Sequence, residues 1–290
     1  MLTRRTLAIA TGLLGLLPLL AACESVQFFL ANVPTVVGPY DRHADIAYGP
    51  GERHGLDVYV PQGAHDNAVI VFWYGGTWAS GSKDKYRFVG AALASEGIVA
   101  VVPDYRLYPK VRFPAFVEDA AEALVWVHQH AREFGGDPQR IFVMGHSAGA
   151  HQAAMLAYDA RWLERAGGDR RWIRGLIGLS GPYWLTPNSD LLYAIFAAPY
   201  APADWQPGRY VDGAAPPSAL FHGRADTVVV PEHAIELDAA LRKAGVASEL
   251  ELYPRLGHVD TLAALSVPAR RRAPLLSQIK AFIERIGPSH

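Results

Sequence analysis

Short apolar runs alternate with helix-like segments along most of the chain, and this alternation limits the fold more than any other feature of the sequence. The run AVIVFWY, residues 68–74, contains no charged position, which is typical of a strand that is covered on both faces. Residues 98–103 are expected to form another buried strand and residues 140–144 a further strand, and helical periodicity over 115–134 lies between them. Strands that alternate with helices favour a mostly parallel sheet with helices on both faces, so we predict an α/β fold.

Eight further segments extend this order. The segment 56–60 alternates in polarity and ends at Pro61, which is typical of an edge strand. No internal repeat or low-complexity linker divides the chain, so we predict one domain over 46–290. The other expected strands are 176–180, 219–222 and 249–253, and the other expected helices are 86–95, 149–158, 232–244 and 275–286.

The overall composition excludes several classes of protein. The 27 basic and 28 acidic side chains give a formal net charge of −1, and no basic stripe is visible, so we expect no nucleic-acid partner. The chain has 1 cysteine, Cys23, which excludes an intramolecular disulfide and a multi-cysteine metal site. We expect neither a metal nor an organic cofactor.

The amino terminus has the pattern of a bacterial export signal. Arg4 and Arg5 precede an apolar stretch over 7–20, which is too short to cross a hydrocarbon core of about 30 Å comfortably. Leu20-Ala21-Ala22-Cys23 resembles a lipobox, in which cleavage occurs before a cysteine that then carries lipid. We therefore predict a signal peptide over 1–22 and lipid attachment at Cys23, with an uncleaved anchor as the alternative.

This signal predicts an exported, membrane-anchored lipoprotein on the periplasmic side. Glu24, rather than aspartate, follows the cysteine, which favours the outer membrane. The export route stays open between the twin-arginine and the general pathway. Residues 23–45 are expected to form a tether, in which the segment 28–30 either meets lipid or docks on the body.

A candidate nucleophile lies in Gly145-His146-Ser147-Ala148-Gly149. This string follows an expected strand and opens an expected helix, which is the context of a nucleophile elbow. Glycines on both sides allow the tight turn that lifts the Ser147 hydroxyl above the sheet. The helix that begins here favours negative charge developing beside the serine.

Two downstream residues can activate that serine. In this fold the acid and then the histidine follow the nucleophile along the chain. Asp226 follows the expected strand 219–222, and His258 follows the expected strand 249–253, so both lie at carboxyl ends of strands. Asp260 remains an alternative to Asp226 as the acid.

Other polar residues near these motifs are expected to have structural roles. His222 is expected to shape the Asp226 loop, and His233 to lie on a helix surface. His151, one turn after Ser147, could line the pocket but is expected to face away from the acid loop. The remaining members of this group are His146, as a filler of the elbow, and Glu118 and Asp119, as acids near a helix start.

An oxyanion hole is expected where the apolar run 68–74 ends. Gly75 and Gly76 follow it, and adjacent glycines let backbone N–H groups point at a substrate oxygen. We expect Gly76, Thr77 and Ala148 to donate these N–H groups, with Gly75 shaping the turn.

With these residues identified, the chain resembles bacterial α/β-hydrolase esterases of the hormone-sensitive-lipase and feruloyl-esterase-like groups, with kynurenine-formamidase-like enzymes close by. The resemblance covers about residues 45 to 285 and is carried by segments 72–78, 81–84 and 103–109 together with the elbow, Asp226 and His258. These families usually carry His-Gly-Gly-Gly-Trp, where this chain has Tyr74 and Thr77 in place of the histidine and the third glycine. The resemblance also implies a structural role for Asp104, Tyr105 and Arg106 beside the oxyanion strand.

The resemblance implies an α/β-hydrolase fold with a small cap inserted over about residues 181–212. Seven aromatic residues lie there, most of them expected to pack within the cap and two or three to line a pocket. We predict a serine carboxylic-ester hydrolase that forms an acyl-enzyme on small or aromatic esters. The alternatives are an arylformamidase-type amidase and a catalytically silent, lipid-anchored binding protein of the same fold.

Overall fold

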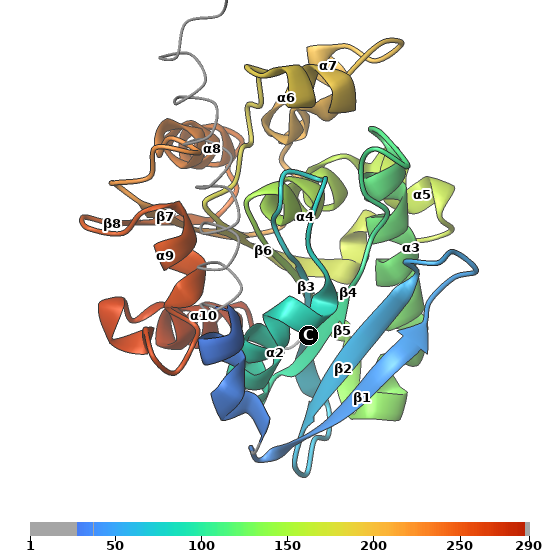
Figure 1. Ribbon diagram of the computed structural model, residues 1–290, viewed down its shortest axis with the longest axis vertical. Coiled ribbons are helices and arrows are strands. Elements are labelled where there is room, and N and C mark those ends of the chain that lie inside the picture. The colour runs from blue at the N-terminus through green and yellow to red at the C-terminus, as the bar shows by residue number, and fades with distance from the viewer. Residues whose placement is uncertain (1–27, 37, 288–290) are drawn as a thin grey trace, which may run out of the picture.

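Eight strands form one twisted sheet at the centre of the molecule (Figure 1). The computed structural model describes residues 28–36 and 38–287. The strand order across the sheet is β1-β2-β4-β3-β5-β6-β7-β8. The strands are β1 (Tyr40–Ala47), β2 (Gly55–Pro61), β3 (Asn67–Trp73), β4 (Val99–Pro103), β5 (Gly136–His146), β6 (Ile173–Leu179), β7 (Ser218–Gly223) and β8 (Ser248–Tyr253).

Six neighbouring strands, from β4 through β3 to β8, pair in parallel, whereas the pairs β1–β2 and β2–β4 are antiparallel. The predicted α/β-hydrolase class, with a mostly parallel sheet, is therefore confirmed. In the run 68–74, every side chain is buried, as expected for a strand between two others.

Helices cover both faces of this sheet. On one face α2 (Arg87–Ala94) and α10 (Leu275–Ile286) lie together, and Lys280 of α10 pairs with Glu96 just after α2 (Figure 1). On the other face α3 (Ala115–His130) packs against α4 (Ala148–Tyr158). The remaining helices are α5 (Ala160–Arg165), α6 (Asp190–Ile195), α7 (Pro202–Trp205), α8 (Glu232–Lys243) and α9 (His258–Ala263).

The expected edge strand at 56–60 is wrong. β2 covers this segment but lies second from the edge, because β1 pairs along it from Tyr40 to Ala47. β2 does end at Pro61, as expected. Its partner β1 is not predicted as a strand from the sequence, because most of its residues are polar. The sheet therefore begins inside the range that the sequence assigns to the tether.

Residue 28 begins the described part of the chain, so the predicted signal peptide and Cys23 lie outside it. The ring of Phe28 packs edge-on against Tyr86 with centroids 5.1 Å apart, whereas Phe29 and Leu30 are exposed. The apolar segment that follows Cys23 is thus divided: one ring docks on the body and two side chains face outward. Within the part that the structure describes, no helix has the length and apolar character needed to cross a bilayer.

Segment 181–212 follows β6 and holds α6, α7 and the 3₁₀ turn η5 (Pro207–Tyr210), above the carboxyl ends of the strands (Figure 1). Five of its seven aromatic residues pack inward, as expected: Tyr183, Phe196 and Trp205 are buried, and Trp184 and Tyr210 are half-buried against the core. Tyr193 and Tyr200 are exposed.

Candidate active site

Ser147 sits on a sharp turn between β5 and α4. Its φ of 53° is positive, which is uncommon for a non-glycine residue. A Cβ on Gly145 would lie 2.3 Å from the backbone of Gly149, and a Cβ on Gly149 would lie 1.9 Å from the carbonyl oxygen of Trp73. Both positions therefore require glycine, and this is the physical basis of the elbow that the sequence predicts.

Three residues that are far apart in the sequence meet at this turn. His258 Nε2 lies 2.9 Å from Ser147 Oγ, and His258 Nδ1 lies 2.8 Å from Asp226 Oδ2. His258 is the first residue of α9, and Asp226 lies in the loop after β7. The structure thus brings together the serine, histidine and acid that the sequence singles out, in a continuous chain of hydrogen bonds.

The Asp226 carboxylate is buried and fully hydrogen-bonded. Oδ1 accepts from the backbone N–H groups of Val228 and Val229, each at 2.9 Å, while Oδ2 faces His258 and His222. Burial alone would raise the pKa of Asp226. The hydrogen bonds from His222 and His258, the charge of His258 and the Val229 N–H outweigh burial and hold that pKa well below its usual value. The carboxylate is therefore ionised at neutral pH.

His222 lies behind this acid, in agreement with its expected role in shaping the Asp226 loop. Its Nε2 lies 2.8 Å from the carbonyl oxygen of Val229 and 3.2 Å from Asp226 Oδ2. A carbonyl oxygen only accepts, so Nε2 carries the proton and shares it between the two oxygens. The side chain is completely buried, so this donor is unavailable to solvent.

His146 has a contact that the sequence does not suggest. Its Nε2 donates to the backbone carbonyl oxygen of His258 at 3.0 Å, so a residue predicted as a filler holds the main chain of the histidine opposite Ser147. Burial, together with the nearby His258, lowers the pKa of His146 to about 3, so the ring is neutral. The partner lies 112 residues away, and no local pattern in the sequence signals it.

The loop after β3 presents unpaired donors near Ser147. Gly76, Thr77 and Trp78 have φ values of 123°, 53° and 53°, so the backbone curls in the left-handed region. Within the described residues, the N–H groups of Gly76, Thr77 and Ala148 donate to no other group of the protein. Gly75 brings this loop against the elbow, because a Cβ there would lie 3.0 Å from Ser147 Cβ.

Thr77 adopts this conformation although it is β-branched, which makes it strained in a way that glycine at the same position would avoid. Threonine can replace glycine here and keep the N–H donor only if its backbone adopts the conformation that the loop requires. The backbone is the glycine-like one, and the threonine adopts it.

Tyr74 occupies the position where related esterases carry histidine. Its hydroxyl donates to Asp104 Oδ1 and accepts a hydrogen bond of 2.7 Å from Arg53. Asp104 also accepts the N–H of Lys83 at 2.7 Å, and the Tyr105 hydroxyl donates to the carbonyl oxygen of Tyr74 at 2.9 Å. These bonds tie both sides of the oxyanion loop to the segment after β4, the structural role that the resemblance implies for Asp104 and Tyr105.

Two expectations about other residues are corrected. Asp119 is completely buried rather than a simple helix-start acid, and it receives the backbone N–H and the guanidinium of Arg106. His233 is half-buried rather than on an open helix surface, and its Nδ1 accepts the N–H of Trp184 from the cap at 3.1 Å.

Asp260 and His151 take no part in the hydrogen bonds that join Ser147, His258 and Asp226. Asp260 accepts the N–H of Gly257 and pairs with Arg272, so it caps α9 and does not orient His258. His151 is completely buried, and its Nε2 donates to the carbonyl oxygen of Trp205 in the cap at 2.7 Å.

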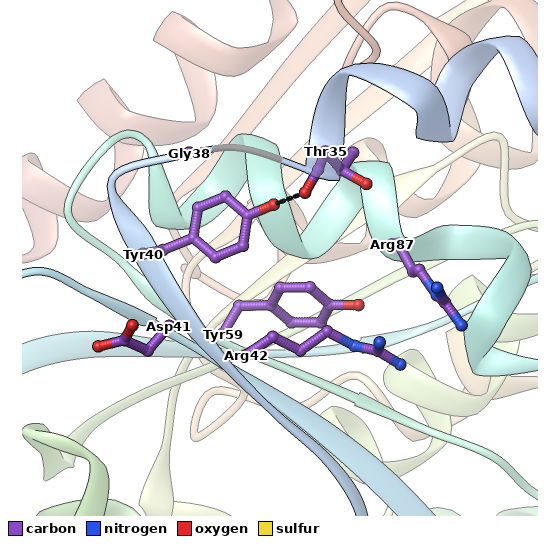
Figure 2. Close-up of a pocket in the computed structure, with 7 residues that line it drawn as sticks. All are labelled: Thr35, Gly38, Tyr40, Asp41, Arg42, Tyr59 and Arg87. Atoms are coloured by element: carbon purple, nitrogen blue, oxygen red, sulfur yellow. Dashed lines mark hydrogen bonds between the residues drawn. The ribbon is translucent and has the colours of Figure 1, made fainter.

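A hollow of about 440 Å³ lies beside the β1–β2 edge, where Arg42, Tyr59 and Arg87 line it (Figure 2). Ser147, Asp226 and His258 do not line it, and β4 and β3 separate β2 from β5 in the sheet. Among the described residues, no group of three or more histidine, aspartate or glutamate side chains could hold a metal ion.

Similarity to known proteins agrees with this geometry. The BD-FAE family model matches residues 56–169, and the prolyl oligopeptidase family model matches residues 184–287. Carboxylesterase NlhH of Mycobacterium tuberculosis is 34% identical in an alignment over 245 residues that covers 74% of this chain and 74% of the relative. The chain belongs to the α/β-hydrolase carboxylesterases. Its relatives in that family include isoprenylcysteine α-carbonyl methylesterase ICME of Arabidopsis thaliana, 33% identical over 74% of this chain and 56% of the relative.

Solved structures of other carboxylesterases agree with the fold. Esterase 2 of Thermogutta terrifontis is 26% identical, with a TM-score of 0.73 over 87% of this chain and 97% of that chain. A carbohydrate esterase from gut microbiota, at 20% identity and a TM-score of 0.74, shares the fold. The chain spans only 52% to 64% of the length of the plant methylesterases that it matches.

Proposed function

We propose that this protein hydrolyses carboxylic esters through an acyl-enzyme on Ser147. The observation that carries the proposal is the continuous set of hydrogen bonds from Ser147 through His258 to Asp226, beside N–H groups without a partner among the described residues. A serine hydroxyl is a weak nucleophile until a base takes its proton, and His258 Nε2 is within reach of that proton.

In the first half-reaction, Ser147 Oγ attacks the ester carbonyl carbon while His258 accepts the serine proton. The buried Asp226 carboxylate holds the imidazole by Nδ1 and stabilises its positive charge. The N–H groups of Gly76, Thr77 and Ala148 receive the oxyanion, and each such donor lowers the barrier by roughly 3 to 4 kcal/mol. His258 then protonates the leaving alcohol.

In the second half-reaction, water attacks the acyl group on Ser147. His258 takes the proton from water and returns it to the serine oxygen as the acid departs. No step needs a metal or a redox cofactor.

The substrates we propose are small or aromatic esters. Esterase 2 of Thermogutta terrifontis, at 27% and 28% identity, has been solved with butyrate and with propionate bound, which favours short acyl groups here. Tyr193 and Tyr200, the exposed aromatic side chains of the cap, could stack against an aromatic leaving group.

Labelling with a fluorophosphonate probe tests the nucleophile. We expect the probe mass on the peptide that contains Ser147, and Ser147→Ala should lose both labelling and turnover of short aryl esters while its thermal unfolding is unchanged. Thr77→Gly is a useful comparison, because it relieves the left-handed threonine and keeps the N–H donor. A wild-type protein that unfolds cooperatively but takes up no probe at Ser147 would indicate a silent binding protein of this fold.

A panel of paired substrates separates the esterase from the arylformamidase. Each aryl acetate is compared with the aryl formamide of the same ring, so that only the cleaved bond differs. Higher kcat/KM on the esters supports the proposal, and higher kcat/KM on the formamides reverses it.

We further propose that the protein is exported and carries lipid on Cys23, with the membrane on the periplasmic side as its location. Only four residues separate Cys23 from Phe28, the first described residue, which already packs on the body. A lipid on Cys23 would therefore keep the enzyme within a few residues' reach of the bilayer. Metabolic labelling with an alkyne fatty acid tests this, with Cys23→Ser as the variant that should remain unlabelled.

A further inference from the structure

Arginine side chains gather on the loops beside the proposed catalytic acid and histidine. Arg224 lies two residues before Asp226, and Arg255 lies three residues before His258. Arg270 and Arg271 belong to the 3₁₀ turn η6 (Arg270–Arg272), which follows α9. All four are exposed, and within the described residues none of the four has a carboxylate partner.

Backbone and side-chain bonds hold these segments together. The N–H of Arg224 donates to the carbonyl oxygen of Tyr253 at 2.9 Å, and the N–H of Ala225 donates to that of Leu256 at 3.1 Å. Arg272 pairs with Asp260 in the first turn of α9, which brings η6 back to the start of that helix. The arginines therefore lie on adjoining loops beside Asp226 and His258.

The charge of this region departs from that of the whole chain. The 290 residues carry a formal net charge of −1, yet the segment 254–272 holds four arginines and a single carboxylate, Asp260. That carboxylate is already engaged by Arg272 and by the N–H of Gly257. The local positive charge is thus unbalanced.

Exposed valines accompany the arginines on the same loops. Val228, two residues after Asp226, is 71% exposed, and Val259, directly after His258, is 57% exposed. Val267, three residues before Arg270, is 52% exposed. A single exposed valine needs no explanation, but three of them among unpaired arginines form a surface that is both apolar and cationic.

We propose that this surface, formed by Arg224, Arg255, Arg270, Arg271 and the three valines, docks on an anionic lipid bilayer. Arginine pairs with lipid phosphates, and short apolar side chains enter the headgroup region beside them. A soluble anionic substrate would account for the arginines, but it would leave the valines in water. Docking in this way would set the loops that carry Asp226 and His258 against the membrane. It goes beyond ester hydrolysis, which does not require it.

Vesicle binding tests this docking without the lipid on Cys23. The chain from Glu24 onward keeps all residues that the structure describes, and a cooperative thermal melt first establishes that it folds. We expect it to sediment with vesicles of phosphatidylcholine mixed with phosphatidylglycerol and not with phosphatidylcholine alone. High salt should release it, because charged contacts with a surface are screened.

The double variant Arg270→Glu and Arg271→Glu should weaken vesicle binding by roughly 20-fold or more, because two cationic contacts become repulsive. The matched control reverses Arg132 and Arg165, exposed arginines in segments that precede the amino ends of β5 and β6. This control has the same net charge and should bind as the wild type does. Val267→Asp should weaken vesicle binding as well. Val267→Ser, which changes no charge, should also weaken it, whereas a purely electrostatic surface would bind this variant as strongly as the wild type.

Turnover of a neutral aryl acetate in solution separates this proposal from that of the ester site. The arginine variants should retain it, so a loss of vesicle binding with turnover intact supports docking alone. If the wild type, the arginine and valine variants and the control all bind vesicles equally, the docking surface is wrong. The esterase proposal is unaffected by that result. If the wild type does not bind vesicles and the arginine variants show a higher KM for an anionic aryl ester, the arginines serve substrate recognition. That result would also overturn the docking proposal.

Discussion

His222 Nε2 lies 3.2 Å from Asp226 Oδ2, the same oxygen atom that faces His258. The imidazole of His222 also bonds the carbonyl oxygen of Val229, so it holds both the acid and the far end of the acid loop. His222 thus acts through Asp226 and does not touch the reacting atoms, which makes it a positioning residue for the proposed reaction.

Replacing His222 by phenylalanine should lower kcat by about 10- to 100-fold with a smaller change in KM, because one hydrogen bond to a buried charge is lost. Without this donor the pKa of Asp226 rises, and its less stabilised carboxylate attracts a proton on His258 more strongly. The acid limb of the kcat/KM profile, which reports protonation of the base, should therefore move to higher pH. His222→Gln should recover part of the activity, since an amide N–H can donate in the same direction.

The control for His222 is His128→Phe. His128 stacks on Trp172 at the surface of α3, away from the acid loop, and its replacement should leave both kcat and the pH profile unchanged. A His222→Phe variant that shows wild-type kcat and the same acid limb would remove the positioning role.

Replacing Tyr74 by phenylalanine should loosen the oxyanion loop. The variant loses the donor to Asp104 and the acceptor for Arg53, and the free energy of unfolding should fall by about 1 to 3 kcal/mol. Burial, together with Tyr105 and Asp104, raises the pKa of Tyr74 well above its usual value, so the hydroxyl remains a donor at any working pH. We expect kcat to fall more than KM rises, since the loop serves the transition state.

Stopped-flow turnover and urea unfolding of Tyr74→Phe, with Tyr193→Phe beside it, measure this effect. Tyr193 is 60% exposed in the cap, so its hydroxyl should contribute nothing to stability. If Tyr74→Phe retains wild-type kcat, the hydroxyl network does not position the loop.

Gly149→Ala should disable the elbow. The new methyl would lie 1.9 Å from the carbonyl oxygen of Trp73, so α4 has to move away from β3. We expect a loss of about 1 to 3 kcal/mol in the free energy of unfolding and the loss of most probe labelling at Ser147. Gly213→Ala is the matched control, because its nearest neighbour is 3.6 Å away and its stability should be unchanged.

Stability should fall as the pH drops from about 6.5 toward 4. Burial lowers the pKa of His151 to about 4, and burial with the nearby His258 lowers that of His146 to about 3, from 6.5 in both cases. In this window the unfolded chain binds protons that the folded chain excludes, so stability rises with pH. Each histidine contributes about 1.4 kcal/mol per pH unit near the middle of the window.

Urea unfolding at a series of pH values measures that slope. His151→Gln keeps a donor for the carbonyl oxygen of Trp205 but cannot titrate, so its slope should be smaller than that of the wild type by about 1.4 kcal/mol per pH unit. An unchanged slope in this variant would show that His151 is protonated equally in both states.

The sequence predicts those parts of the molecule that local patterns determine. The run 68–74 must be a buried strand because it is apolar throughout, and the glycines around Ser147 permit only a tight turn. The positions of Asp226 and His258 follow from the strands that precede them. Ser147, Asp226 and His258 lie within hydrogen-bond distance because each follows a strand of a parallel sheet, and the carboxyl ends of such strands meet at one edge.

Residues whose environment depends on distant partners could not be predicted in this way. β1 is mostly polar, and only its pairing with β2 makes it a strand. Asp119 has the sequence context of a helix-start acid, and its burial depends on Arg106. The contact between His146 and the His258 carbonyl joins positions 112 residues apart, which no periodicity reports.

The ring of Phe196 joins the cap to the oxyanion loop. It packs edge-on against Trp78, with centroids 4.8 Å apart, and Trp78 follows Gly76 and Thr77, which we propose as oxyanion donors. A change in the cap that alters substrate specificity should consequently also change the rate, through the contact of Phe196 with Trp78. Grafting a cap from another esterase would require the graft to carry its own counterpart of Phe196, or the catalytic turn would lose its lateral support.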